Sequence, residues 1–300
     1  MSLLVVGTLA YDSVETVHEK RDDQLGGSAT YCALAAATFT RPRLVSVVGE
    51  DFLPEHVALL EREGVETLGL EVVAAGRTFR WGGRYEPDWN TRTTTDTQLN
   101  VLATFDPKLP EPFRDSQFVF LANAAPTVQA RALDQVDAPR FVMVDTMNLW
   151  IEKARPELEK LLRRVDAIVL NDEEARMLTG TRNLILAAQQ VLGMGPRYVI
   201  LKKGEHGAFL MGEDVHFALP AYPVTEVIDP TGAGDSFAGG FMGSLAREGS
   251  CEAQALRRGM LYGTVTASFC VERFSVEGLC DVSMDAVERR ADLLRSITTV

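Results

Sequence analysis

The sequence predicts an α/β fold with a mostly parallel central sheet covered by helices on both faces. Short apolar runs rich in β-branched residues alternate with longer amphipathic runs. The short runs are apolar throughout, which is typical of parallel strands buried on both faces. Apolar residues make up 46% and charged residues 24% of the 300 residues, which is ordinary for a globular chain.

Six apolar runs are predicted to be strands. They lie at Leu3–Gly7, Leu44–Val48, Phe118–Leu121, Phe141–Val144, Ala167–Leu170 and Tyr198–Leu201. Helical patterns lie at Ala29–Phe39, Pro54–Glu63, Ile151–Arg164, Leu184–Leu192, Gly234–Arg247, Glu252–Val271 and Met284–Ile297. Since no internal repeat or low-complexity linker interrupts this order, we expect residues 1–300 to form a single domain.

Two stretches break the alternation of strands and helices. Residues 9–24 are polar, and residues 76–101 are rich in Thr, Arg and Trp with a period of two residues. The second stretch is typical of antiparallel strands inserted between α/β units. Because polar insertions of this size often form a lid over a site or an interface, we expect both to be lid segments.

The charge and the cysteines limit the classes of partner. The formal net charge is −12, from 42 acidic and 30 basic residues, which disfavours nucleic acid and anionic membranes as partners. The four cysteines and four histidines lack zinc-ligand spacing, so free thiols are expected and no zinc site. The first residues lack the pattern of a secretory signal, and no window approaches 18 apolar residues, so we expect a cytoplasmic protein.

The most informative segment is Val227–Gly243, with the sequence VIDPTGAGDSFAGGFMG. Its glycines free a turn at a helix N-terminus, where successive N–H groups and the helix dipole suit a phosphate or an oxyanion. Asp235 lies in the first helical turn. The local sequence leaves open whether this carboxylate is catalytic or only complements the helix dipole.

Two common nucleotide-binding patterns do not fit this segment. No Lys follows the glycines as the Walker A pattern G-x-x-x-x-G-K-[ST] requires. Phe237 stands where the third glycine of G-x-G-x-x-G would be, and no acidic ribose partner is placed as that fingerprint requires. A dinucleotide-dependent oxidoreductase is therefore disfavoured.

The segment DPTGAGDSFAGGF closely resembles the C-terminal motif of the ribokinase-like (PfkB) carbohydrate and nucleoside kinases. Three other segments agree in type and order: Gly26-Gly27 before an apolar helix, Asn171–Glu174 like the family's N-x-x-E motif, and the turn Lys202–Gly207. The resemblance spans roughly residues 3–275. It implies a ribokinase-like three-layer α/β/α fold with a mostly parallel sheet and a small β lid.

The resemblance also implies an activity. The chain would be an ATP- and Mg²⁺-dependent kinase that transfers the γ-phosphoryl of ATP to a hydroxyl of a small sugar. A nucleoside kinase similar to adenosine kinase is the alternative, and a non-catalytic sensor of nucleotide or sugar is a weaker one. Asp235 and Glu174 are both present, which favours an enzyme, since a sensor could lose either residue.

Roles for residues around the phosphates follow from the same resemblance. Asp235 would take the proton from the acceptor hydroxyl, and Gly232, Ala233 and Gly234 would supply the anion hole. The resemblance assigns nucleotide or metal contacts to a further set: Asn171, Lys202, Gly204, Gly207, Glu174 through a Mg²⁺-bound water, and Asp229 with Thr231 at a monovalent cation such as K⁺.

Structural alternatives stay open for two of these positions. Asn171 and Glu174 lie three residues apart at a predicted helix start, so they could form a capping box and nothing more. Lys202 could be a solvated lysine at a strand end.

Four residues are predicted to form the binding site for the acceptor. Asp12 matches an acidic residue that grips sugar hydroxyls in the family, although it could also be a surface turn residue. Gly26 and Gly27 would let the backbone approach the acceptor closely. Tyr31 departs from the family's Asn at that position and would either stack on a base or sugar face or pack inward.

Two points about substrate and assembly are left open by the sequence. Asp145 and Asn148, in VDTMN, resemble an acid–amide pair of some sugar-acid kinases, but the basic residue that follows in that pattern is absent. The lid would either close over the small-molecule acceptor or pair with the same element of a second chain in a homodimer.

Overall fold

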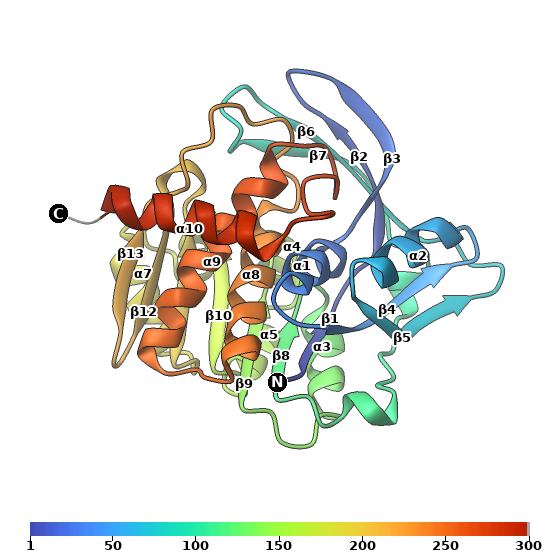
Figure 1. Ribbon diagram of the computed structural model, residues 1–300. Helices are drawn as coiled ribbons and strands as arrows, with labels where there is room; N and C mark the ends of the chain where they lie inside the picture. The colour runs from blue at the N-terminus through green and yellow to red at the C-terminus, as the bar shows by residue number, and fades with distance from the viewer. Residues whose placement is uncertain (299–300) are drawn as a thin grey trace.

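The computed structural model describes residues 1–298 and has two sheets. The larger sheet has nine strands in the order β13-β12-β11-β10-β9-β8-β1-β4-β5 (Figure 1). All its neighbouring strands are parallel except at the β12 and β13 edge, where the pairing is antiparallel. Its strands are β1 (Leu3–Val6), β4 (Pro42–Gly49), β5 (Glu66–Val73), β8 (Phe118–Leu121), β9 (Phe141–Asp145), β10 (Ala167–Asn171), β11 (Tyr198–Lys202), β12 (Ala208–Gly212) and β13 (His216–Leu219).

Helices cover both faces of this sheet. Leu3 and Val5 of β1 belong to one core, and Leu4 and Val6 belong to another on the opposite face. The first core includes residues of α1 (Ser28–Ala37), α2 (Pro54–Arg62), α8 (Ala233–Glu248) and α9 (Ala253–Val271), and α10 (Met284–Thr298) packs beside α9. The second includes residues of α3 (Pro126–Leu133), α4 (Asn148–Lys153), α5 (Arg155–Leu162), α6 (Asp172–Thr179) and α7 (Leu184–Leu192). The predicted three-layer α/β/α fold is confirmed.

One expected element was wrong. The single helix predicted over residues 151–164 is two helices, α4 and α5, which meet at Ala154 with φ −137° and ψ 32°. Pro156 lies in the first turn of α5, where its missing N–H costs no intrahelical hydrogen bond. A helix can restart at such a proline but does not readily continue through it.

The smaller sheet joins the two polar stretches of the sequence. It contains β2 (Ala10–Glu15), β3 (Lys20–Gly26), β6 (Phe79–Tyr85) and β7 (Arg92–Gln98) in the order β3-β2-β6-β7. β2 and β6 pair in parallel and so join two antiparallel hairpins that are far apart in the sequence. Figure 1 shows this sheet at the top of the molecule, beyond one end of the larger sheet.

Short 3₁₀ helices occupy Asn100–Thr104, Glu111–Phe113 and Gly204–His206. Between residues 1 and 298, none of the helices combines the length and apolar character that a membrane span needs.

The strand order locates the site. Along the sheet, β4 and β5 lie on one side of β1, whereas β8 to β11 lie on the other. In open parallel sheets, ligands bind at the carboxyl ends of the strands next to such a reversal. The last residues of β9, β10 and β11 are Asp145, Asn171 and Lys202.

Candidate active site

The carboxyl ends of three neighbouring strands bring together a lysine and a carboxylate. Asn171 lies opposite Lys202 in the β10–β11 register, and Val169 lies opposite Asp145 in the β9–β10 register. Lys202 Nζ is 3.9 Å from Asp145 Oδ1, and their side chains are only 18% and 7% exposed. Lys202 is therefore not a solvated lysine at a strand end.

Lys202 also lies beside the glycine turn at the start of α8. A Cβ added to Gly234 would be 2.7 Å from Lys202 Nζ. Burial by itself would lower the pKa of Lys202, but the surrounding carboxylates raise it. The lysine is therefore charged and lies close to the start of α8. A phosphate bound there would be stabilised both by the ammonium group and by the N–H groups of the helix N-terminus.

The turn from Asp229 to Asp235 is shaped from inside the protein. Asp229 is buried, and its two carboxylate oxygens accept hydrogen bonds from the N–H groups of Thr231 at 2.9 Å and Ser275 at 3.1 Å. Gly232 caps α8 in the left-handed region at φ +76°. These constraints fix the turn at the start of α8, where Gly234 lies beside Lys202.

Tyr31 supports this turn. Its side chain is buried, and a Cβ at Gly232 would overlap the Tyr31 ring. Only glycine can fit against the ring at this position. Of the two alternatives left open by the sequence, the geometry favours inward packing of Tyr31 over an open face for a ligand.

Close packing of α8 holds its N-terminus in place. A Cβ at Gly239 would overlap the carbonyl oxygen of Cys32 in α1, and one at Gly240 would overlap Thr266 Oγ1 in α9. The small residues of the segment therefore let α8 lie directly against both neighbouring helices.

Asp235 lies in a strongly negative environment. Burial and the nearby carboxylate of Asp145 raise the pKa of Asp235 to about 8, although Lys202 acts in the opposite direction. A carboxyl group that titrates near neutral pH can accept a proton from a substrate and release it again.

Asn171 and Glu174 form the capping box that the sequence allowed. Asn171 Oδ1 accepts a hydrogen bond from Glu174 N at 2.8 Å, and Glu174 Oε2 accepts one from Asn171 N at 2.7 Å. The cap occupies one Glu174 oxygen. Burial and the Asp145 carboxylate raise the pKa of Glu174 to about 7, so the group faces the same negative cluster as Asp235.

Asp12 is a buried residue of the smaller sheet and is not a surface turn residue. It lies on β2 with 5% of its surface exposed, and it accepts a hydrogen bond from Gly27 N at 3.4 Å. A Cβ at Gly26 would overlap its carboxylate. Burial raises the pKa of Asp12 to about 7. The di-glycine motif thus makes room for a buried carboxylate as well as for close backbone approach.

The turn between β11 and β12 needs its glycines for conformational reasons. Gly204 and Gly207 have φ values of +53° and +81°, and a Cβ at Gly207 would overlap the carbonyl oxygen of Leu219. A Cβ at Gly204 would overlap Asn90 Oδ1 at the tip of the β6–β7 hairpin. The β6–β7 hairpin therefore reaches the turn to which the resemblance assigns nucleotide contacts.

The sequence did not single out Arg92 and Tyr85. Tyr85 Oη accepts a hydrogen bond from Thr231 Oγ1 at 3.3 Å, and Arg92 lies directly opposite Tyr85 in the β6–β7 register. Local sequence carries no signal for this arrangement, because the pairing of β6 with β7 decides which residues face the glycine turn. Asp145 carried a signal, as the polar last residue of a buried strand.

The donor set fits a magnesium ion that arrives with a nucleotide. In residues 1–298, no three His, Cys, Asp or Glu side chains gather closely enough to hold a metal ion by themselves. Mg²⁺ usually takes one or two carboxylates plus phosphate oxygens and water. Next to Asp145, the buried oxygens Thr146 Oγ1 and Asn148 Oδ1 lack a hydrogen-bond partner, so oxygen donors remain free at this strand end.

Known proteins resemble this chain along most of its length. Residues 2–278 match the pfkB family of carbohydrate kinases. A cytidine kinase of Thermococcus kodakarensis is 28% identical over 253 residues, covering 82% of this chain and 89% of that protein. A nucleoside kinase of Methanothermobacter thermautotrophicus is 27% identical and covers 96% and 94% of the two chains.

A solved structure shares the fold. The nucleoside kinase of Burkholderia thailandensis in complex with inosine has a TM-score of 0.77 and 18% identity, and covers 97% of this chain and 96% of that one. The family match and the named functions of the relatives agree. The chain belongs to the pfkB family of carbohydrate kinases and is a phosphotransferase that acts on a hydroxyl group of a sugar or nucleoside.

Proposed function

We propose that this protein transfers the γ-phosphoryl group of ATP to a hydroxyl of a nucleoside. The observation that carries the proposal is the position of Asp235. It lies in the first turn of α8, in a buried cluster with Lys202 and within the electrostatic influence of Asp12. Such a site combines a proton acceptor, cations for phosphate and a polar grip for an acceptor hydroxyl.

Asp235 acts as the general base in this proposal. It accepts the proton of the acceptor hydroxyl while the hydroxyl oxygen bonds to the γ-phosphorus and the bond to the β–γ bridging oxygen breaks, releasing ADP. Because its pKa is about 8, the ionised form that accepts the proton grows as the pH rises toward 8, so turnover should increase with pH in this range.

The glycine turn and Lys202 stabilise the phosphoryl group. The N–H groups of Gly232, Ala233 and Gly234 form the anion hole, and Lys202 supplies a positive charge beside Gly234. Mg²⁺ bound to ATP would neutralise phosphate charge, with Glu174 holding one of its waters through the oxygen that the cap leaves free.

The remaining nucleotide and cation contacts come from the family resemblance. We propose that Asn171, Gly204 and Gly207 lie along the bound nucleotide. Asp229 and Thr231 are proposed to hold a monovalent cation such as K⁺ through lone pairs that their hydrogen bonds leave unused.

The acceptor class rests on Asp12 and on the relatives. A buried carboxylate such as Asp12, beside Gly26 and Gly27, suits the vicinal hydroxyls of a ribose, which free sugars and nucleosides both offer. Two relatives at 28% and 27% identity, which cover 82% and 96% of the chain, are named cytidine kinase and nucleoside kinase. Two others at 26% and 24% identity, which cover 74% and 96% of the chain, are named uncharacterized sugar kinase and inositol 3-kinase. We prefer a nucleoside to the free sugar that the sequence first suggested, because the first two relatives have the higher identity.

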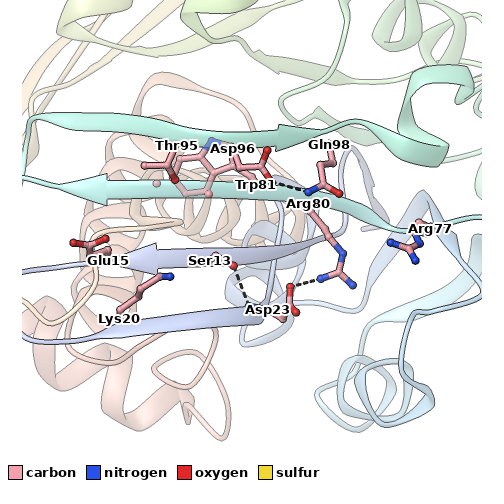
Figure 2. Close-up of a pocket in the computed structure, with 12 residues that line it drawn as sticks. Ser13, Glu15, Lys20, Asp23, Arg77, Arg80, Trp81, Thr95, Asp96 and Gln98 are labelled. Atoms are coloured by element: carbon pink, nitrogen blue, oxygen red, sulfur yellow. Dashed lines mark hydrogen bonds and ion pairs between the residues drawn. The ribbon is translucent and has the colours of Figure 1, made fainter.

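We further propose that the smaller sheet acts as a lid over the acceptor. Its outer face is a polar hollow lined by Ser13, Glu15, Arg80 and Asp96, among others, with Asp23 bonded to both Ser13 and Arg80 (Figure 2). An obligate interface would be more apolar. The polar face therefore favours a lid that closes on the acceptor rather than a homodimer formed through the lid. Light scattering across a concentration series distinguishes a monomer from such a dimer.

One experiment tests the activity and the acceptor class together. The protein is incubated with ATP, Mg²⁺ and a panel of nucleosides and free sugars, and ADP release is followed, with the Asp235→Asn variant as the blank. Nucleoside-dependent release that the variant lacks is expected. Release with sugars alone would assign a sugar kinase, and no acceptor-dependent release in either arm would overturn the catalytic proposal.

A further inference from the structure

Arg92 lies on the face of the smaller sheet that covers the glycine turn. It is directly opposite Tyr85 in an antiparallel pair, so the two side chains share a face. Tyr85 identifies this face as the inner one, because it is buried and receives a hydrogen bond from Thr231. The Arg92 guanidinium lies 5.0 Å from the centre of the Trp81 ring, and its charge opposes the rise that burial causes in the pKa of Tyr85.

The register of β2 agrees with this placement. Asp12 pairs with Trp81 in the parallel β2–β6 register, so Asp12 shares the inner face with Trp81. Arg84 is next to Tyr85 in sequence and therefore points to the outer face, where it pairs with Glu15 at 3.6 Å. Arg84 and Arg92 thus lie on opposite faces of the sheet.

Beneath Arg92 the charge balance is strongly negative. Its charge acts on three carboxyl groups that come from three different elements: Asp12 on β2, Glu174 on α6 and Asp235 on α8. Asp145 adds a further carboxylate to the cluster, whereas Lys202 is the cation that the larger sheet contributes to it. A nucleoside triphosphate that binds beside these carboxylates needs more positive charge to offset the repulsion than one lysine provides.

We propose that Arg92 is a catalytic residue of the lid, which binds the γ-phosphoryl group of ATP while that group moves to the acceptor. This inference rests on the proposed function. In the structure, the guanidinium lies over Trp81 and against Tyr85, whose partner Thr231 belongs to the glycine turn. When the phosphoryl group is present, the same guanidinium turns toward it and donates a forked pair of hydrogen bonds.

The proposal gives a functional reason for the contact between the lid and the glycine turn. The Tyr85–Thr231 hydrogen bond ties the position of β6 and β7 to the anion hole. Arg92 then completes the phosphoryl site only when the lid is in place. Transfer to water would be slow while the lid is open, because one of the charges that stabilise the phosphoryl group is absent.

Steady-state kinetics of Arg92 variants test the role. Arg92→Gln is expected to lower kcat on the order of 10²-fold with a smaller effect on the KM of the acceptor, since the contact strengthens in the transition state. Arg92→Lys keeps the charge without the fork and should recover part of the loss. Arg84→Gln is the matched control on the outer face and should leave kcat unchanged. Turnover of Arg92→Gln within twofold of wild type would overturn the proposal.

A binding measurement gives a readout that does not depend on turnover. The chain has three tryptophans, so Trp89→Phe with Trp150→Phe leaves Trp81 as the sole indole. An ATP analogue with an imido bridge between the β and γ phosphates, added with Mg²⁺, should change Trp81 fluorescence as the guanidinium leaves the ring. ADP with Mg²⁺ should not, and the further Arg92→Gln variant should respond to neither.

The two readouts separate the failure of this inference from the failure of the proposed function. An equal response to ADP and the analogue would show that Arg92 does not bind the γ-phosphoryl group, and would sink the inference even in an active kinase. A response specific to the analogue in a protein that turns over no acceptor would support the contact while overturning the catalytic proposal.

Discussion

The carboxylate of Asp12 fills the space that a side chain at Gly26 would require. The two residues lie on the neighbouring strands β2 and β3, and a Cβ at Gly26 would overlap Asp12 Oδ2. The next residue, Gly27, donates its N–H to the same oxygen and caps α1. The di-glycine motif therefore sets the position of the buried Asp12 carboxylate, which we propose contacts the acceptor.

Gly26→Ala tests this relationship. The new methyl group should push the Asp12 carboxylate away, raising the KM for the acceptor by about tenfold or more, while the KM for ATP changes little. Stability should fall by about 1–3 kcal/mol, as expected for overpacking in a buried site. Gly193→Ala is a control at the end of α7: its φ of −65° suits alanine, and the added Cβ makes one tight contact, 3.3 Å from the Gln190 carbonyl oxygen, without the overlap seen at Gly26. An unchanged acceptor KM in Gly26→Ala would remove Asp12 from the acceptor site.

Asp235→Asn should abolish most turnover and raise stability above pH 4. Loss of the base lowers kcat by about 10²-fold or more while ligand binding persists. The folded-state pKa of about 8 exceeds the unfolded value of about 3.9, so the folded wild type holds an extra proton between these pH values and loses stability as pH rises. The Asn variant lacks this loss.

Urea unfolding at pH 4, 6 and 8 measures the second effect. The variant should gain stability relative to wild type as pH rises from 4 to 8, and the gap should be constant above that range. A gap independent of pH would mean that Asp235 is ionised in the folded protein at all these pH values, contrary to its burial beside Asp145.

Glu174→Gln separates capping from metal chemistry. Glutamine retains an oxygen that can accept from Asn171 N, so the capping box and the stability of α6 should largely persist. The Mg²⁺ concentration needed for half-maximal turnover should rise severalfold, because the charge that holds a bound water is lost. Asn171→Ala is the opposite control: it removes a cap worth about 0.5–2 kcal/mol and leaves the carboxylate. If both variants shift the Mg²⁺ titration equally, Glu174 acts only through the cap.

Tyr31→Ala distinguishes packing from stacking. Removing the buried ring from the Gly232 turn should cost about 3–5 kcal/mol of stability and lower kcat through a looser anion hole. Affinity for nucleosides and sugars should fall alike. A selective loss of about 1–3 kcal/mol in nucleoside affinity would instead indicate a stacked base. Tyr31→Phe keeps the ring and should behave like wild type in both assays.

Hydrogen exchange reports on the lid. Residues 76–101 form one hairpin of the smaller sheet, and a bound acceptor beneath it should protect the amides of β6 and β7. The β12–β13 hairpin lies at the far edge of the larger sheet and serves as an internal control. Identical exchange across 76–101 with and without saturating acceptor would make the hairpin a fixed element.

Local patterns along the chain were enough to predict the fold class, the family and the glycine turn. Apolar runs buried on both faces left few arrangements for the strands, and their six positions agree with the structure. The turn before α8 needs glycine at φ +76° and small residues in the helix, and both requirements are local enough to be recognised along the chain. The capping pair Asn171 and Glu174 can be predicted for the same reason, since its members lie only three positions apart in the sequence.

Which side chains meet at the site depends on how the elements pack in three dimensions. The contact of Lys202 with Asp145 depends on the order of β9, β10 and β11 in the sheet. The inward position of Arg92 depends on the register of β6 with β7, where a slip of one residue would turn it outward. Burial of Tyr31 depends on how α1 packs against the turn before α8. Each of these relations joins residues distant in sequence, so no local pattern encodes it.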